Sequence, residues 1–172
     1  VKKGNTLIVL DSAVRWAVNN KLVNATFVNR KPEGSVEPKA YVDERADRGA
    51  QVLGGAIFQV RIDRTHPVAY GYAGSSLSVF RRGTAFLELS KSPYATPLQY
   101  TRQPLLAGYI SPQNLSLLRE SASVLVDGQG SGRVILMADN PVFRAFWYGT
   151  QKLFANAIFF GPVIRPQTLR EE

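Results

Sequence analysis

The first part of the chain combines a buried strand with a helix. A continuous apolar run at 6–10 predicts a strand that is buried on both faces, as in a parallel sheet. Asp11 and Ser12 follow at once and are good helix-capping residues, and Ala13, Trp16 and Ala17 then recur at helical spacing. The pattern therefore predicts a strand, a tight turn and a helix.

Later segments predict further strands. Residues 56–63 alternate between apolar and polar side chains, which is typical of a half-exposed strand. Shorter strands are predicted at 77–80, 85–89, 123–126 and 133–137. We expect a hairpin turn at 81–84. The glycine-rich 127–132 resembles a phosphate loop, but a strand follows it instead of a helix, which favours a flexible turn.

Two helices complete the pattern. Ser111 and Pro112 predict the start of a short helix. Asn140 and Pro141 predict the start of a longer helix that ends before Gly161, with apolar residues at i, i+3 and i+4 spacing. Between the first helix and the half-exposed strand, residues 29–55 are polar and contain proline and glycine, so we expect a long loop or an insertion.

These elements predict one α/β domain over 1–161, followed by a polar, loosely held tail at 162–172. We expect a flavodoxin-like, partly parallel sheet with a β-rich excursion at 56–89 and a long C-terminal helix. A length of 172 residues suits a single domain. The apolar runs are too short for a membrane span. The chain begins with Val1, which we interpret as the start of a processed or excised piece of a longer polypeptide.

Composition restricts the possible chemistry. The chain has no cysteine and one histidine, which excludes thiolate catalysis and any site built from two histidines. Lys and Arg number 21 and Asp and Glu 13, so the net charge is +8. The arginines are scattered over every predicted element, which argues against nucleic acid as a partner. A polyanion-binding module remains an alternative.

The single histidine, His66, directly follows a predicted strand. It could act as a general base, or bind a metal together with Asp63 and another carboxylate. A structural hydrogen bond that orders the loop is the favoured interpretation, because no nucleophile or second ligand stands at a recognisable spacing.

The end of the chain resembles a known family. Residues 132–161, with the aromatic-rich stretch Phe143-Arg144-Ala145-Phe146-Trp147-Tyr148, look like the C-terminal end of bacterial zinc carboxypeptidase-like proteins. Residues 63–72, 106–111 and 4–8 resemble the same region, in the same order. In that family a carboxypeptidase A-type metallopeptidase domain precedes a domain similar to class I glutamine amidotransferases.

The resemblance implies that residues 1–161 are the later part of the amidotransferase-like domain, without its N-terminal part. It also implies that the peptidase domain and its zinc lie upstream of Val1. The zinc site of such peptidases is a His-x-x-Glu pair with a distant histidine, which one histidine cannot supply. We therefore expect neither a cofactor nor a metal in this chain. The resemblance also implies a periplasmic or secreted protein, whose partners are the upstream peptidase domain and the peptide substrate.

Class I amidotransferases carry a nucleophilic cysteine on a strand-to-helix elbow and a His-x-Glu pair after a late strand. In this chain Asp11 or Ser12 stands at the elbow, and the later stretch is 138–140, without histidine. The resemblance thus implies a noncatalytic accessory domain. We expect structural or interdomain roles for four residues, namely Asp11, His66, Arg144 and Trp147.

One catalytic alternative stays open. Ser12, His66 and Asp139 would form a serine hydrolase triad if the fold brought them together. The sequence around Ser12 lacks the usual Gly-x-Ser-x-Gly pattern, and helix capping explains this residue equally well.

Overall fold

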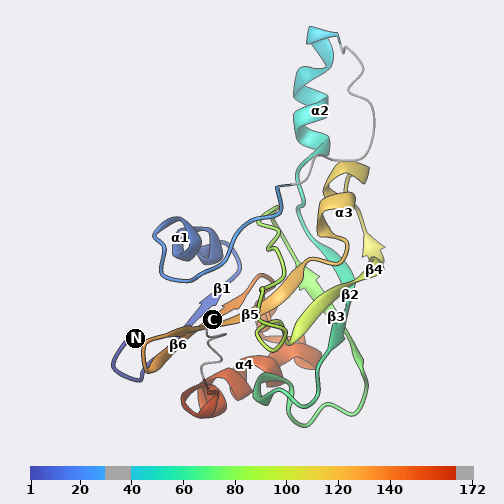
Figure 1. The fold of residues 1–172 in the computed structure, drawn as a ribbon. Coiled ribbons are helices and arrows are strands. Elements are labelled where there is room, and N and C mark those ends of the chain that lie inside the picture. The colour runs from blue at the N-terminus through green and yellow to red at the C-terminus, as the bar shows by residue number, and fades with distance from the viewer. Residues whose placement is uncertain (30–39, 166–172) are drawn as a thin grey trace.

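The computed structural model describes residues 1–29 and 40–165 of the chain. One mixed sheet forms the centre of the fold. The strand order of this sheet is β1 (Thr6–Leu10), β6 (Gly132–Met137), β5 (Ala122–Gln129), β4 (Leu98–Gly108), β2 (Ala56–Ile62) and β3 (Ser76–Arg81). The pair β1 and β6 is parallel, and the other neighbouring strands of this sheet are antiparallel (Figure 1). The expected partly parallel sheet is confirmed, with one parallel pair among the described strands.

Helices cover the two faces of the β1–β6–β5 region. Helix α1 (Ala13–Asn19) lies on one face and α4 (Tyr148–Phe160) on the other (Figure 1). Alternate residues of β6 therefore enter different hydrophobic clusters. The cluster under α1 includes Val14, Ala17, Val134 and Leu136. The cluster under α4 includes Ile135, Met137, Leu153 and Ala157. Burial on both faces explains the apolar run of β6, all of whose residues are buried, whereas Val9 is the only fully buried residue of the edge strand β1.

Several predicted elements are present. Strand β2 buries Ala56 and alternate residues after it, as the alternation predicts. The glycine-rich 127–132 is the turn of the β5–β6 hairpin, where Gln129 pairs with Gly132. Helix α3 (Pro112–Leu118) begins at Ser111, whose hydroxyl accepts a hydrogen bond from the Asn114 N–H at 3.2 Å.

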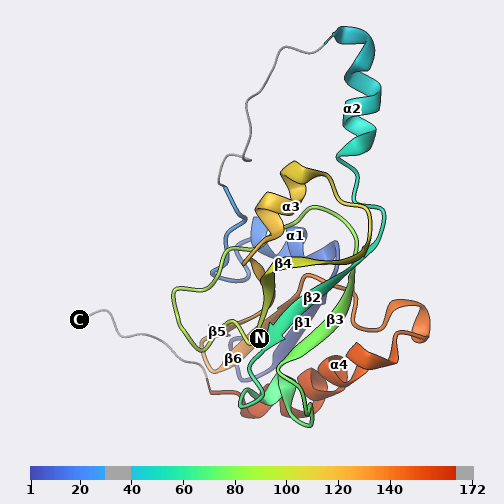
Figure 2. The same ribbon diagram turned by 90° about the vertical axis from the view of Figure 1, so that its right-hand side faces the viewer.

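The segment expected to be a loop or an insertion contains a 3-10 turn and an α-helix. A short 3-10 turn, η1 (Tyr41–Asp43), leads into α2 (Glu44–Ala50), so these residues form a helical insertion instead of a loop. None of the residues of α2 is buried, and the helix projects from the body of the molecule (Figures 1 and 2). The remaining part of that prediction, at 30–39, lies outside the described residues.

The predicted hairpin at 81–84 is wrong. After β3 the chain does not return as a neighbouring strand. Instead, Leu87 forms isolated bridges with Phe27 and Ala122. The reason is that the side chain of Arg81 points inward and donates to the carbonyl of Ala85 at 2.7 Å, which holds this segment across the end of the sheet.

The last helix begins later than predicted, at Tyr148 instead of Pro141. Arg144 and Ala145 have φ angles of 50° and 57°, in the left-handed region that cannot continue a right-handed helix. Phe143 stacks on Phe80 with 3.9 Å between ring centroids, which fixes this segment over β3. Asn140 accepts from the N–H of Val142 and caps only a turn.

Two further features differ from the sequence pattern. Strand β4 was not predicted, because only three of its residues are buried and one of these is Pro104.

The expected tail begins with the 3-10 turn η4 (Gly161–Val163), and the following Ile164 is buried in the core under α4. The domain therefore includes residues beyond 161.

The two sides of α4 differ in burial, which gives a test of the fold. Leu153 is 2% exposed, whereas Phe159 is 78% exposed. We expect Leu153→Ala to lower the free energy of unfolding by about 2–5 kcal/mol, because it leaves a cavity in the core. Phe159→Ala is the control and should change it by less than about 0.5 kcal/mol. Urea unfolding of both variants measures the difference, and equal losses would contradict this placement of α4.

Candidate functional site

The strand-to-helix elbow is a tight turn with an unusual backbone. Asp11 has a φ of 50°, which places a non-glycine residue in the left-handed region. Its N–H donates to the carbonyl of Met137 at 2.9 Å, and its carbonyl accepts from the N–H of Val14 at 3.1 Å. The turn is thus held by β6 on one side and by α1 on the other. Strained turns of this kind present nucleophiles in hydrolases.

The side chain at the elbow forms an ion pair instead. An oxygen of Asp11, Oδ2, lies 3.3 Å from Nη2 of Arg82. The Arg82 guanidinium also lies 5.7 Å from the centroid of the Phe143 ring. Ser12 is exposed, and although it precedes the first residue of α1, its side chain makes no capping hydrogen bond. The elbow therefore carries an exposed hydroxyl and a partly buried carboxylate that is paired with Arg82.

Asp139, which follows β6, belongs to a buried polar network. Its Oδ2 accepts from the Ser123 hydroxyl at 2.5 Å, and its Oδ1 accepts from the Tyr100 hydroxyl. Arg81 donates to the Tyr100 oxygen at 2.9 Å and lies 3.5 Å from Asp139 Oδ1. These four side chains come from β3, β4, β5 and the end of β6. The network satisfies the carboxylate inside the protein, so Asp139 is not presented to a ligand.

Electrostatics explains why these groups stay together. Burial raises the pKa of Asp139, while the Arg81 guanidinium and the two hydroxyl donors act in the opposite direction. Burial also raises the pKa of the Tyr100 hydroxyl, so this group remains a hydrogen-bond donor. A buried charge without its partner is strongly unfavourable. Each member of the network therefore requires the others.

His66 has a structural hydrogen bond. It precedes the 3-10 turn η2 (Pro67–Ala69), and its Nδ1 accepts from the N–H of Val68 at 3.2 Å. The neighbouring Asp63 accepts from the N–H and hydroxyl of Thr65. Within residues 1–29 and 40–165, no three His, Asp or Glu side chains are grouped closely enough to hold a metal ion.

The fold does not bring Ser12, His66 and Asp139 together. Three successive antiparallel pairings, from β6 to β5, β4 and β2, make β2 run opposite to β1 and β6. Ser12 and Asp139 follow β1 and β6, whereas His66 follows β2 and lies at the other end of the sheet. His66 and Arg133 line one cavity there. Asp139 lies six positions after Arg133, which corresponds to about 20 Å along an extended chain. This separation excludes the triad.

The two aromatic-region candidates make contacts within the chain. Trp147 donates through Nε1 to the carbonyl of Ser78 at 3.3 Å and lies near the Phe80 ring. Arg144 is exposed, with its guanidinium 5.3 Å from the centroid of the Phe143 ring. Trp147 therefore covers the edge strand β3, and Arg144 is left on the surface beside it.

Sequence reasoning missed the partners that hold these positions. Arg81 and Arg82 are adjacent in the segment expected to be a hairpin turn, but their side chains point to different places. Arg81 is buried in the network and Arg82 meets the elbow. The alternation of β3 is the signal that separates them, since successive side chains of a strand point to opposite faces. Arg133 is also buried, so part of the positive charge lies inside the molecule and not on a polyanion-binding surface.

Comparison with known proteins supports the fold. The crystal structure of a ThuA-like protein from Parabacteroides merdae is similar, with a TM-score of 0.52 and 11% sequence identity. The similarity covers 98% of this chain and 64% of that protein, so the chain spans less than two thirds of its length. No family model and no curated protein matches the chain. The expected amidotransferase-like α/β class is confirmed as a fold. In the described part of the chain, no helix has the length and apolar character to cross a bilayer.

The buried network gives a test of stability. Asp139→Ala leaves the Arg81 guanidinium buried without its counter-charge, so we expect a loss of about 3–5 kcal/mol in the free energy of unfolding. Adding Arg81→Met to this variant should recover part of the loss, because the unpaired charge is removed. Urea unfolding of the single and double variants measures the coupling. Strictly additive losses would show that the two side chains do not depend on each other.

His66 gives a test by pH. Burial lowers the pKa of His66 from 6.5, with Asp63 acting in the opposite direction. Protonation is then harder in the folded chain than in the unfolded chain. The stability present above pH 6.5 should therefore decrease as the pH falls below 6.5 toward the folded-state pKa.

In His66→Asn the side chain keeps an acceptor for the Val68 N–H but does not titrate. We expect this variant to show a flatter dependence of unfolding free energy between about pH 5 and 7 than the native chain. Urea unfolding at several pH values tests this. Identical profiles would rule out His66 as the source of the dependence.

Proposed function

We propose that this chain is a noncatalytic, amidotransferase-like accessory domain of a larger zinc carboxypeptidase-like protein. In this proposal it packs on the upstream peptidase domain and supports it, and the whole protein is periplasmic or secreted. Zinc and the peptide substrate belong to the peptidase domain.

The observation that carries the proposal is the ion pair at the elbow. Asp11 occupies the strained turn where this type of fold places a nucleophile, and its carboxylate is paired with Arg82. A carboxylate held by a guanidinium is a weak nucleophile, because its negative charge is already stabilised. The second position used by amidotransferases, after the late strand, corresponds to Asp139, which is enclosed by the buried network. Both positions now serve stability.

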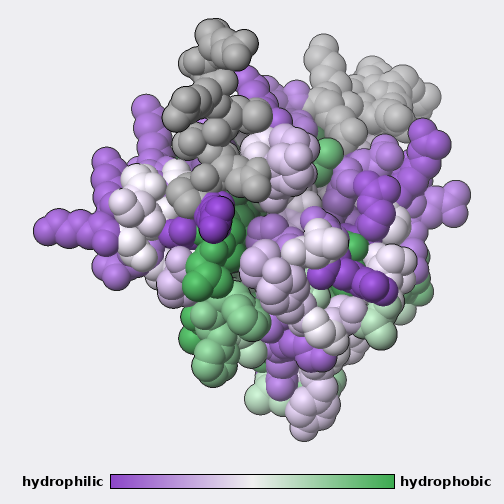
Figure 3. Space-filling model, turned by 60° about the horizontal axis from the view of Figure 1, so that its bottom comes forward, coloured by the Kyte–Doolittle hydropathy of each residue, from purple (hydrophilic) through white to green (hydrophobic). Residues whose placement is uncertain are grey.

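An exposed apolar surface supports the packing role. Ile158, Phe159 and Val163, on the last turns of α4 and in η4, are 52%, 78% and 65% exposed. The face of the molecule drawn in Figure 3 carries a band of hydrophobic surface among hydrophilic residues. Large apolar side chains grouped at the surface are typical of contact sites between domains. We propose that this surface, formed by Ile158, Phe159 and Val163, contacts the peptidase domain.

Activity assays test the noncatalytic part. We expect the chain to release no ammonia from L-glutamine, no C-terminal amino acid from peptides in the presence of zinc, and no nitrophenol from p-nitrophenyl acetate above background. Ser12→Ala and His66→Asn are the matched variants. Ester hydrolysis that disappears in Ser12→Ala would overturn the proposal and favour a hydrolase instead.

Binding in trans tests the packing part. The peptidase domain, which the proposal places upstream of Val1, should bind this chain when it is expressed as a separate protein. We expect Phe159→Ser to weaken this binding at least about tenfold, because central aromatic residues dominate interfaces. Tyr41→Ser, at a 90% exposed position on the projecting η1, is the control and should bind like the native chain. Equal affinities for both variants would place the contact elsewhere.

A further inference from the structure

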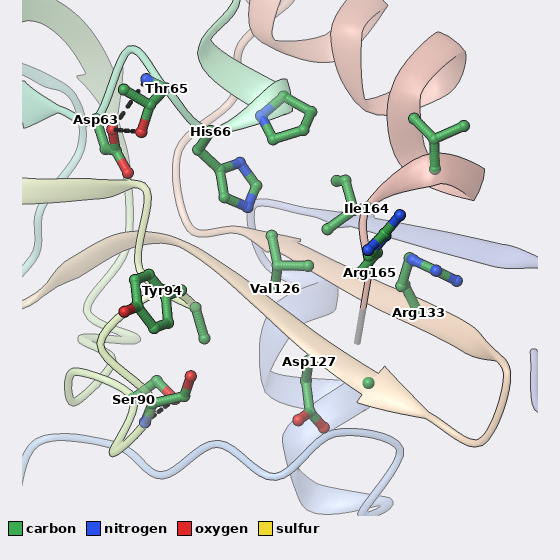
Figure 4. A pocket seen from close by; sticks show the side chains of 15 residues that line it. Asp63, Thr65, His66, Ser90, Tyr94, Val126, Asp127, Arg133, Ile164 and Arg165 are labelled. Carbon is green, nitrogen blue, oxygen red and sulfur yellow. Dashed lines mark hydrogen bonds between the residues drawn. The ribbon is translucent and has the colours of Figure 1, made fainter. Parts of the chain in front are cut away.

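A cavity lies at the end of the sheet opposite to the elbow. Its volume is about 390 Å³, and it lies between the loop after β2, the segment 90–95, the β5–β6 hairpin and the residues that follow α4. Figure 4 shows His66 above its centre, Arg133 and Arg165 on one side, and Ser90 and Tyr94 on the other. A volume of this size suits a small molecule. The cavity contains His66 but lies apart from the elbow and from Asp139.

Arg133 is the most unusual residue of the cavity. It is 6% exposed, and its Nη1 donates to the carbonyl of Ser131 at 2.8 Å. Its Nε is buried and has no hydrogen-bond partner among the described residues, where Arg133 also forms no ion pair. A buried guanidinium with an unpaired N–H is unfavourable unless an acceptor is supplied. Arg165 lines the same side and adds a second positive charge.

His66 adds a third donor. Because its Nδ1 accepts from a backbone N–H, the proton of the neutral ring must be on Nε2. Figure 4 shows the other ring nitrogen pointing into the open part of the cavity. Since burial lowers the pKa of His66, the ring is neutral at pH 7 and donates from Nε2. Arg133 and Arg165 thus place two positive charges beside this space, and His66 directs an N–H into it.

The carboxylates of the cavity are already engaged. Asp127 accepts through Oδ2 from the N–H of Asn24 at 2.7 Å and from the side chain of Gln129 at 2.9 Å. Asp63 accepts through Oδ1 from the N–H and hydroxyl of Thr65. Neither carboxylate forms an ion pair with Arg133 or Arg165 among the described residues. The donors of the cavity therefore remain available for an external anion.

We propose that this cavity binds a small organic acid through its carboxylate group. Arg133 and Arg165 bind the carboxylate by charge-assisted hydrogen bonds, with a further donor from His66. The apolar side chains of Val126 and Ile164 line the same cavity and suit a short aliphatic body, which inorganic phosphate lacks. This inference does not depend on the proposed function.

The only histidine of the chain provides a local probe. We expect a titration with isovalerate at neutral pH, followed through the NMR signals of the His66 ring, to give one saturable change in chemical shift. Arg165→Gln removes an exposed charge at the cavity and should weaken binding about tenfold. Arg133→Lys keeps the charge of the buried residue but loses the planar fork, and should also weaken binding.

Arg45→Gln on the projecting helix α2 removes the same charge far from the cavity and is the matched control. It should bind isovalerate like the native chain. If the His66 signals do not move in the native chain, or if Arg45→Gln weakens binding as much as Arg165→Gln, the proposal is wrong. Tighter binding of inorganic phosphate than of isovalerate in the same titration would overturn the assignment to organic acids. Circular dichroism of each variant checks that it is folded.

Discussion

The buried pair of Arg81 and Asp139 connects the two kinds of strand pairing in this sheet. Arg81 ends the edge strand β3, and Asp139 follows the strand that pairs in parallel with β1. Tyr100 of β4 and Ser123 of β5 form hydrogen bonds with this pair, so one buried polar network links side chains from four strand segments. Apolar packing tolerates small shifts between strands, but a buried charge pair does not. The network therefore fixes how the antiparallel strands meet the parallel pair.

The two ends of the sheet differ in how fully their polar side chains are paired within the chain. At the end near Asp139, the elbow and the aromatic segment around Phe143 are tied by Arg82, which contacts both. At the opposite end, His66 and Arg133 face a cavity with unengaged donors. The first end is closed by interactions within the chain, whereas the second has groups that remain to be satisfied. A search for ligands should accordingly begin at the second end.

Local patterns predicted the parts of the fold that depend on apolar burial. The runs that became β1, β2 and the β5–β6 hairpin were visible because their side chains follow simple periodicities. The late start of α4 was not visible, because it depends on a segment whose left-handed Arg144 adjoins Phe143, which stacks on the distant Phe80. Asp139 and Ser12 were found as candidates, but their separation from His66 depends on strand direction. Strand direction is a property of the whole sheet, which no short segment encodes.

The elbow also constrains how the sequence can change. Glycine at position 11 would relieve the left-handed backbone, and asparagine would tolerate it, but each would leave Arg82 without its carboxylate partner. Aspartate is among the few residues that accept this backbone and also carry a negative charge. The backbone conformation and the charge of Arg82 thus favour the same side chain at position 11. We expect this position to vary less among related sequences than other positions of similar exposure.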